Sequence, residues 1–226
     1  MDRIVDTLRS GAPILAVDPG GACPPLAPFL ARAGATLFID CERKAICVSA
    51  VPGLVAASRA AGGTTMLRAE NVAPEILTRY LDCGIDALVI PRVESAAAAD
   101  AIVATARDQA LGAKRTAIIV QIESRAGVAA AGAIARAEGL DGVLLGPNDL
   151  AVSMGHPGAP DHPQVQDALK EVTQILNAAR MPFGLPVTPT TLPGWAARGA
   201  RLFYIAAADF VASALHPYAE AARAHC

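Results

Sequence analysis

Residues 117–146, AIIVQIESRAGVAAAGAIARAEGLDGVLLG, decide the fold of this chain. Two short apolar runs, Ala117–Glu123 and Gly142–Gly146, flank an alanine-rich stretch near residues 126–137. The runs are almost continuous in apolar residues, which is typical of parallel strands that are buried on both faces. The segment therefore predicts one strand–helix–strand unit with parallel strands.

The same unit recurs along all 226 residues. We expect eight strands at Ile14–Val17, Thr36–Asp40, Thr65–Arg68, Ala87–Pro91, Ala117–Glu123, Gly142–Gly146, Phe183–Val187 and Arg201–Ala206. We expect helices near residues 25–33, 48–61, 74–83, 95–111, 126–137, 163–180, 190–198 and 209–224. Four glycines stand shortly before strands, where a left-handed residue ends the preceding helix: Gly34, Gly84, Gly139 and Gly199.

Eight such units in a chain of this length predict a single α/β domain over residues 1–226, a (β/α)8 TIM barrel. A doubly wound open sheet is the structural alternative. It is less favoured because no G-x-G-x-x-G sequence follows the first strand. Hydrophobic residues make up 53% of the chain and aromatic residues 4%, so alanine and the aliphatic residues must form the core.

Composition and charge exclude several classes of protein. The formal net charge is −2 and no basic block occurs, so nucleic-acid binding is not expected. No apolar stretch reaches the roughly 18 residues of a membrane span, and the N-terminus lacks the apolar core of a signal peptide. We therefore expect a cytoplasmic protein. The cysteine count is odd, at five, and no C-x-x-C pair occurs, which argues against disulfides and zinc-thiolate sites.

Polar residues gather where the expected strands end, which is where barrels of this type carry their chemistry. They are Asp40, Glu42, Arg43, Arg68, Gln121, Glu123 and the run Gly146-Pro147-Asn148-Asp149. Two carboxylates, Glu123 and Asp149, follow neighbouring strands, and Arg68 lies two strands away. One interpretation is that these groups only form ion pairs that close the top of the barrel.

The functional interpretation is a metal site. Glu123 and Asp149 could bind one hard divalent cation (Mg²⁺, Mn²⁺ or Co²⁺) and leave positions for water and substrate. Those positions suit the carboxylate and ketone oxygens of a 2-oxo acid, and the cation would stabilise an enolate as a Lewis acid. Arg68 would bind the same anion. A Schiff-base mechanism is disfavoured because no lysine lies in a strand run.

The segments QIESRAG at residues 121–127 and GPNDLAVSMG at residues 146–155 resemble the HpcH/HpaI aldolase family. This family comprises class II metal-dependent pyruvate aldolases, including 2-dehydro-3-deoxyglucarate aldolase, and the similarity runs from about Leu37 onward. The resemblance implies that Glu123 and Asp149 are metal ligands and that Arg68 stabilises the keto or enolate oxygen. It also implies that Gln121 and the Gly146–Asp149 segment bind substrate. Members form homo-oligomers, commonly hexamers or trimers of dimers, in which the C-terminal helix can pack on a neighbour.

The chain departs from the family pattern after the second strand. The family reads D-x-E-H there, whereas this chain has Asp40-Cys41-Glu42-Arg43. An arginine cannot act as a general base at ordinary pH, so the usual base is missing. We expect Asp40, Glu42, Arg43 and Arg68 to take part in catalysis. A metal-bound hydroxide, or a carboxylate such as Glu42 or Asp18, would replace the missing base. His156, in a loop after the sixth strand, is a further candidate base.

Two further departures concern the rim of the site. The first strand ends in Asp18-Pro19-Gly20-Gly21, and the loop that family members carry before the fifth strand is missing. Alternatives to an aldolase therefore stay open: an oxaloacetate-type decarboxylase, in which Arg43 would hold a second carboxylate, or a citrate-lyase-β-like enzyme that cleaves a CoA ester. A non-catalytic paralogue that binds a 2-oxo acid is the alternative from another class.

Overall fold

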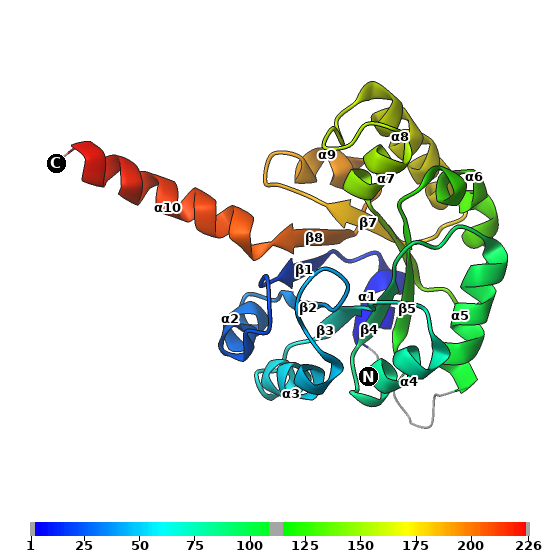
Figure 1. Ribbon diagram of the computed structural model, residues 1–226, viewed down its shortest axis with the longest axis horizontal. Helices are drawn as coiled ribbons and strands as arrows, with labels where there is room; N and C mark the ends of the chain where they lie inside the picture. The colour runs from blue at the N-terminus through cyan, green and yellow to red at the C-terminus, as the bar shows by residue number, and fades with distance from the viewer. Residues whose placement is uncertain (1–2, 109–114, 225–226) are drawn as a thin grey trace.

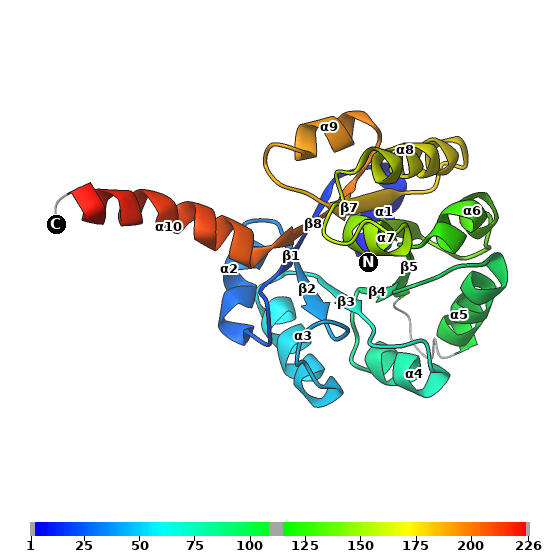
Figure 2. The same cartoon turned by 45° about the horizontal axis from the view of Figure 1, so that its top comes forward.

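The computed structural model describes residues 3–108 and 115–224 and contains a closed barrel of eight parallel strands (Figures 1 and 2). The strands are β1 Ile14–Asp18, β2 Thr36–Asp40, β3 Thr65–Arg68, β4 Ala87–Ile90, β5 Ala117–Ile122, β6 Gly142–Leu145, β7 Phe183–Pro186 and β8 Leu202–Ala206. β8 pairs with β1 from Ile14↔Leu202 to Asp18↔Ala206, and this pairing closes the barrel. The predicted fold is confirmed, and every predicted strand end lies within one residue of the observed one.

Most helices follow the strands and form an outer layer around the barrel (Figure 2). The helices are α1 Arg3–Ser10, α2 Ala27–Arg32, α3 Val51–Ala60, α4 Pro74–Asp82, α5 Ala96–Asp108, α6 Arg125–Ile134, α7 Pro147–Ser153, α8 Pro163–Ala178, α9 Leu192–Ala197 and α10 Ala207–Ala224. The four glycines predicted to end helices all have positive φ, from 72° to 99°. The predicted absence of a loop before β5 falls at residues 109–114, outside the described residues.

Two helices were not expected from the sequence. The apolar side of α1, formed by Ile4, Val5 and Leu8, packs into the cluster that fills the barrel interior and closes its lower end. α7 begins directly after β6, at Pro147, whereas the sequence analysis interpreted residues 146–149 as the end of a strand. Proline is favoured at the first position of a helix because its missing N–H is not needed there. The loop at residues 155–163 therefore follows α7 rather than β6.

The barrel interior explains which side chains reach the site. Its apolar filling includes Ala16, Phe38, Met66, Ile119 and Leu202, which all point inward. Side chains two residues further along a strand point to the same side. The next inward layer, toward the C-terminal ends, is therefore polar and consists of Asp18, Asp40, Arg68, Gln121 and Tyr204. A larger apolar cluster fills the space between the strands and the surrounding helices.

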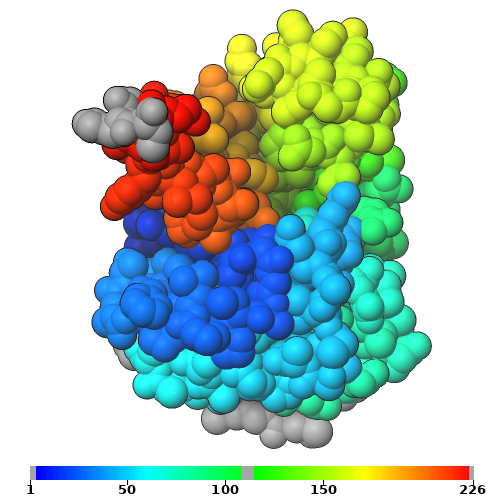
Figure 3. Space-filling model, turned by 60° about the vertical axis from the view of Figure 1, so that its left-hand side comes forward, coloured from blue at the N-terminus to red at the C-terminus, as the bar shows by residue number. Residues whose placement is uncertain are grey.

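Helix α10 leaves the barrel at the end of β8 and projects away from it (Figures 1 and 2). Figure 3 views the molecule from the side on which this helix lies. Four large apolar side chains on this helix are exposed: Phe210, Val211, Leu215 and Tyr218. On the barrel, Leu15 of β1 and Phe29 of α2 are also exposed. Among the described residues, no helix is both long and apolar enough to cross a membrane.

Four of the five cysteines lie among the described residues. All four are free thiols: Cys23, Cys41, Cys47 and Cys83. Cys226 lies outside the described residues.

Candidate active site

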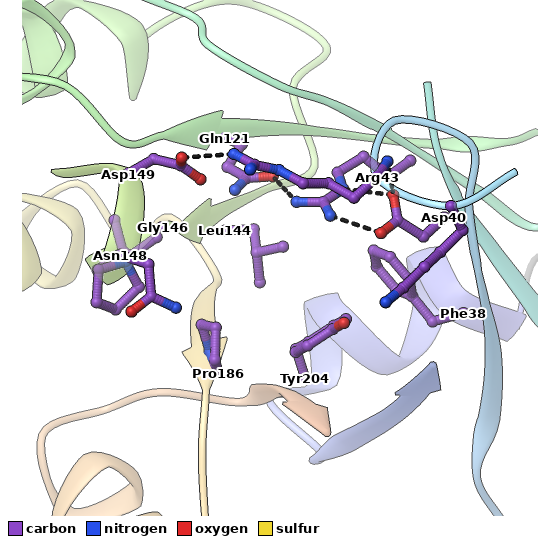
Figure 4. Close-up of a pocket in the computed structure, with 14 residues that line it drawn as sticks. Phe38, Asp40, Arg43, Gln121, Leu144, Gly146, Asn148, Asp149, Pro186 and Tyr204 are labelled. Carbon is purple, nitrogen blue, oxygen red and sulfur yellow. Dashed lines mark hydrogen bonds and ion pairs between the residues drawn. The ribbon is translucent and has the colours of Figure 1, made fainter. Parts of the chain in front are cut away.

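A pocket of about 250 Å³ opens at the C-terminal end of the barrel (Figure 4). Its lining contains most of the predicted site residues, namely Asp40, Arg43, Arg68, Gln121 and the segment Gly146–Asp149. Phe38, Lys44, Leu144, Leu145, Pro186 and Tyr204 complete the lining. Glu42 and Glu123 line an adjoining hollow that shares Arg43 and Asp149 with the pocket. The structure thus gathers these predicted site residues at one end of the barrel, whereas His156 lies elsewhere.

Glu123 follows directly after β5 and is buried, with 4% of its surface exposed. Its Oε1 accepts a hydrogen bond from the backbone N–H of Arg92 at 2.9 Å. Its Oε2 accepts one from the side-chain amide of Gln121. Across from it lies Gly146, where an added Cβ would come within 2.6 Å of the Glu123 side chain. The close approach of the β5 and β6 ends therefore requires glycine at position 146.

The charge state of Glu123 depends on its carboxylate neighbours. Burial raises the pKa of Glu123 to about 7, and the charges of Asp149 and Glu42 act in the same direction. The backbone N–H of Arg92 and the charge of Arg68 oppose the shift but do not cancel it. A bound cation would favour the ionised form of such a group.

Asp149 lies in the first turn of α7, not at the end of a strand as predicted. Its Oδ1 is 2.5 Å from the guanidinium Nη2 of Arg43, whose side chain is about half exposed. Arg43 thus occupies one oxygen of Asp149 from the β2–α3 loop. The two residues are 106 positions apart, and no sequence pattern indicated that they would form an ion pair.

Asp40 and Arg68 form a two-pronged ion pair on the neighbouring strands β2 and β3. Arg68 donates from Nε to Oδ1 at 3.0 Å and from Nη2 to Oδ2 at 2.8 Å. Burial lowers the pKa of Arg68, but the hydrogen bond and charge of Asp40 and the charge of Glu42 raise it overall. Arg68 also reaches Gln121 Oε1 at 3.5 Å, and its guanidinium lies 6.0 Å from the ring centre of Phe38.

Asp40 also orders the loop that follows β2. Its Oδ1 accepts hydrogen bonds from the backbone N–H groups of Glu42 and Arg43, at 3.2 and 3.1 Å. Both oxygens of Asp40 are therefore engaged, and the carboxylate is 1% exposed. This arrangement suits a residue that positions Arg68 and the loop.

Glu42 lies between two arginines. Its Oε1 accepts from Arg92 Nε and Nη2 at 3.1 and 2.5 Å. Its Oε2 is 3.2 Å from Arg68 Nε but lacks a hydrogen bond of good geometry within the described residues. The sequence analysis did not assign Arg92 to the site. Arg92 has an unusual positive φ of 56°, which aims its N–H at Glu123, and no sequence signal indicates this.

Tyr204 and Asp18 form a pair on the side of the barrel made by β8 and β1. The Tyr204 hydroxyl donates to Asp18 Oδ2 at 2.7 Å, and Asp18 Oδ1 accepts from the N–H of Gly20 at 2.7 Å. The Tyr204 ring stands edge-on to Phe38, with ring centres 5.0 Å apart. Asp18 was a candidate base, whereas Tyr204 was missed. Its position two residues after the inward-facing Leu202 was the signal that could have identified it.

His156 lies outside the linings of the pocket and the adjoining hollow. Its Nε2 is 2.8 Å from Gln164 Oε1, and its ring stacks on His162 with centres 3.5 Å apart. His162 caps α8 through a hydrogen bond from the N–H of Gln164. The structure therefore does not place His156 where it could replace the missing base.

The donor set around Glu123 fits a hard divalent cation. No group of three or more His, Cys, Asp or Glu side chains is arranged to hold a metal in the part of the chain that the structure describes. Magnesium is often held by only one or two carboxylates, with water and substrate completing its shell. Glu123 and Asp149 provide two, and a cation beside Glu123 would oppose the burial and the neighbouring negative charges that raise its pKa.

A parallel (β/α)8 barrel with carboxylates and arginines at the C-terminal ends of its strands has the construction of a TIM-barrel enzyme. Residues 39–215 match the HpcH/HpaI aldolase/citrate lyase family, and the chain belongs to this family. The family prediction is therefore confirmed.

Two curated relatives and one solved structure illustrate the similarity. The chain is 29% identical over 217 residues to a hydroxypyruvate/pyruvate aldolase of Pseudomonas aeruginosa, covering 85% of this chain and 81% of the relative. It is 31% identical over 172 residues to a 5-keto-4-deoxy-D-glucarate aldolase of Escherichia coli, covering 66% and 67%. A family protein from Burkholderia cenocepacia superposes with a TM-score of 0.92 at 25% identity, covering 99% of this chain and all of the other.

Proposed function

We propose that this chain is a divalent-metal-dependent carbon–carbon lyase of the class II pyruvate aldolase type. It cleaves a 4-hydroxy-2-oxo acid to pyruvate and an aldehyde. The observation that carries the proposal is the placement of two neighbouring carboxylates, Glu123 and Asp149, beside Gln121 and Arg68 at the pocket. The aldolase relatives support the class of reaction.

Glu123 and Asp149 would hold the cation, which is Mg²⁺, Mn²⁺ or Co²⁺. When bound, the cation supplies Lewis-acid chemistry to the ketone group of the 2-oxo acid. Gln121 holds Glu123 in place by donating to its Oε2. Arg43 bonds to only one of the two carboxylate oxygens of Asp149, which would leave the other oxygen for the cation.

Arg68 and the start of α7 bind the 2-oxo acid. Arg68 is fixed by Asp40 and retains Nη1 on the side of Gln121, so it can donate to the oxygen that gains negative charge. The segment Gly146–Asp149 lines the opposite wall and takes the substrate carboxylate. Glu42, between Arg68 and Arg92, supports this arrangement from the loop after β2.

An oxaloacetate-type decarboxylase is the second candidate, and Arg43 is the observation that favours it. Arg43 stands where the family carries a histidine and, together with Lys44, adds positive charge to the pocket lining. A guanidinium there can pair with a second substrate carboxylate. Loss of CO₂ also produces the enolate without removing a hydroxyl proton, so this reaction tolerates the missing histidine.

Pyruvate release tests the proposal. The protein is treated with EDTA, supplied with Mg²⁺, Mn²⁺ or Co²⁺, and assayed on 4-hydroxy-2-oxo acids and oxaloacetate. We expect release that depends on the cation and falls about a thousandfold in Glu123→Ala and Asp149→Ala, since the Lewis acid contributes several kcal/mol. No release by folded wild-type protein with any cation would refute the lyase and favour a CoA-ester substrate or a binding-only paralogue.

The protein is also proposed to be a cytoplasmic homo-oligomer, a hexamer or trimer of dimers. Exposed apolar side chains on α10, including Leu215 and Tyr218, support this, as does the exposure of Leu15 and Phe29 on the barrel. Burying these side chains against another copy would remove apolar surface from water. Light scattering of wild type and Leu215→Glu tests it: a single monomeric mass for wild type would contradict the proposal.

A further inference from the structure

We propose that Tyr204 and Asp18 form the proton-transfer pair of this enzyme, in place of the histidine that the β2–α3 loop lacks. Tyr204 exchanges the proton with the substrate hydroxyl, and Asp18 receives it from Tyr204. This inference rests on the proposed aldolase function and adds the residues that carry its proton.

The position of Tyr204 in the pocket is the first support. Tyr204 lines the pocket together with Arg68 and Gln121, and Figure 4 shows it across the pocket from Asp149. A substrate bound between Arg68 and the start of α7 would therefore face Tyr204 from across the pocket. The Tyr204 ring is held edge-on by Phe38, so the hydroxyl has a fixed place.

The environment of Asp18 is the second support. Asp18 is 2% exposed, and each of its carboxylate oxygens accepts one hydrogen bond. The donors are the Tyr204 hydroxyl and the Gly20 N–H. In this geometry Tyr204 donates its proton to Asp18 and turns its oxygen lone pairs to other partners. A hydroxyl with a carboxylate behind it can accept a proton from one side as it gives one up on the other.

The other candidate bases at the pocket are already engaged. Both oxygens of Asp40 accept hydrogen bonds from Arg68, and one also accepts two from the loop backbone. Glu42 is paired with Arg92 and Arg68. Glu123 and Asp149 are assigned to the cation. Among the pocket-lining residues that the structure describes, Tyr204 is the hydroxyl group backed by a carboxylate.

The proton follows a balanced route. In cleavage, the C4 hydroxyl proton moves to the Tyr204 oxygen while the Tyr204 proton moves to Asp18 Oδ2. The electron pair of the O–H bond forms the C=O bond of the aldehyde, and the C3–C4 bond breaks. The electron pair of the C3–C4 bond forms the C2=C3 bond of the enolate. The π electron pair of the C2 carbonyl moves onto the ketone oxygen. The proton then returns from Asp18 through Tyr204 to C3, which yields pyruvate and leaves both side chains unchanged.

The acidity of Tyr204 agrees with this route. Burial raises the pKa of Tyr204, and the hydrogen bond to Asp18 raises it further. Tyr204 therefore stays neutral at physiological pH. It can pass a proton on to Asp18 as it receives one, but it does not persist as a tyrosinate.

The test compares two reactions of the same metal-loaded protein, in wild type, Tyr204→Phe, Asp18→Asn and a control, Tyr80→Phe. Tyr80 is buried on α4 and does not line the pocket, so its variant controls for loss of a buried phenol hydroxyl. We expect Tyr204→Phe to lower kcat for cleavage of a 4-hydroxy-2-oxo acid about a hundredfold or more. Oxaloacetate decarboxylation should fall by less than about tenfold, because it removes no hydroxyl proton and needs a proton only at C3 of the enolate, which water can supply.

Asp18→Asn should give the same split between the two reactions, with KM little changed and a normal circular dichroism spectrum. Equal losses in both reactions for Tyr204→Phe and Asp18→Asn would overturn the inference, since a purely structural role predicts them. Unchanged cleavage in folded Tyr204→Phe would also overturn it. If wild type catalyses neither reaction, the proposed function itself fails. That outcome is distinct from a change, in the variants, of the ratio of the cleavage rate to the decarboxylation rate.

Discussion

The two sides of the pocket differ in how closely they keep the family pattern. On the β5–β6 side, Gln121 and Glu123 lie against Gly146 and Asp149 follows in the first turn of α7. The resemblance assigns all three to the site. On the β8–β1–β2 side, Arg43 replaces the family histidine and bonds to Asp149 across the pocket. Tyr204 and Asp18 add a pair that the resemblance did not lead us to expect.

The difference indicates which parts of the reaction each side serves. Binding a cation and a 2-oxo acid needs fixed carboxylates and an arginine, and those residues are all present. Proton transfer needs a group that can gain and lose a proton, which Arg43 cannot do. In our proposal, the β5–β6 side therefore serves binding and the side formed by β8 and β1 serves proton transfer.

Beyond the two proposed cation ligands, the largest effect is expected at Arg68, because its loss lowers both activity and stability. Arg68→Ala removes a donor to the developing negative charge, which costs about a hundredfold or more in kcat. It also leaves Asp40 buried without its ion pair, which lowers the free energy of unfolding by about 3 kcal/mol. Pyruvate release and urea unfolding measure the two effects.

Arg68→Lys and Arg59→Ala are the matched controls. The lysine keeps the charge but not the two-pronged bond to Asp40, so it should recover stability only in part. Arg59 donates to the Gly84 carbonyl outside the pocket, and its loss should leave kcat unchanged. Full activity in Arg68→Ala would show that the two sides of the pocket do not share this arginine.

An intermediate effect is expected at Gly146, on the binding side alone. In Gly146→Ala the new methyl would meet Glu123 at 2.6 Å and the Gln121 amide at 2.9 Å. Overpacking of this kind costs about 1–3 kcal/mol of stability, and displaced ligands should weaken cation binding about tenfold or more. Gly194→Ala on α9 is the control, because an added methyl there meets nothing within 4 Å. Unchanged cation affinity in Gly146→Ala would contradict the assigned role of Glu123.

The smallest effect on aldol cleavage is expected at Arg43. If Tyr204 and Asp18 carry the proton, Arg43→His changes kcat for cleavage by less than about tenfold. A new general base would raise kcat roughly a hundredfold only in a site that has no other base. The same variant should raise KM for oxaloacetate, because Arg43 no longer pairs with the second carboxylate. A rise of a hundredfold or more in cleavage would instead show that the site is that of an aldolase that has lost its histidine base, which the substitution restores. Steady-state kinetics on both substrates separate these results.

The sequence predicted the barrel well because its signal is local. Each strand is a short apolar run closed by a polar residue, and the polar ends collect at one mouth through the parallel topology alone. Glu123, Asp149, Arg68 and Gln121 were assigned on that basis and on the resemblance, and the structure brings them together. Their roles in binding stay predictions until they are measured.

Other features could not be read from the sequence. The contact of Arg92 with Glu123 is made by a backbone N–H in a positive-φ residue, which side-chain patterns do not report. The Arg43–Asp149 pair joins the loop after β2 to the first turn of α7, 106 positions away. α7 was missed because its Gly-Pro start resembles the polar end of a strand. Tyr204, by contrast, could have been found from the alternation of inward-facing residues along β8.

Titration of Mn²⁺ into EDTA-treated protein, with and without pyruvate, tests the central claim most directly. The measurement follows the electron paramagnetic resonance signal of free Mn²⁺ for wild type, Glu123→Ala and Tyr204→Phe. The account predicts one site per chain that pyruvate tightens, that Glu123→Ala abolishes, and that Tyr204→Phe leaves intact. Mn²⁺ binding of equal strength in wild type and Glu123→Ala would contradict it.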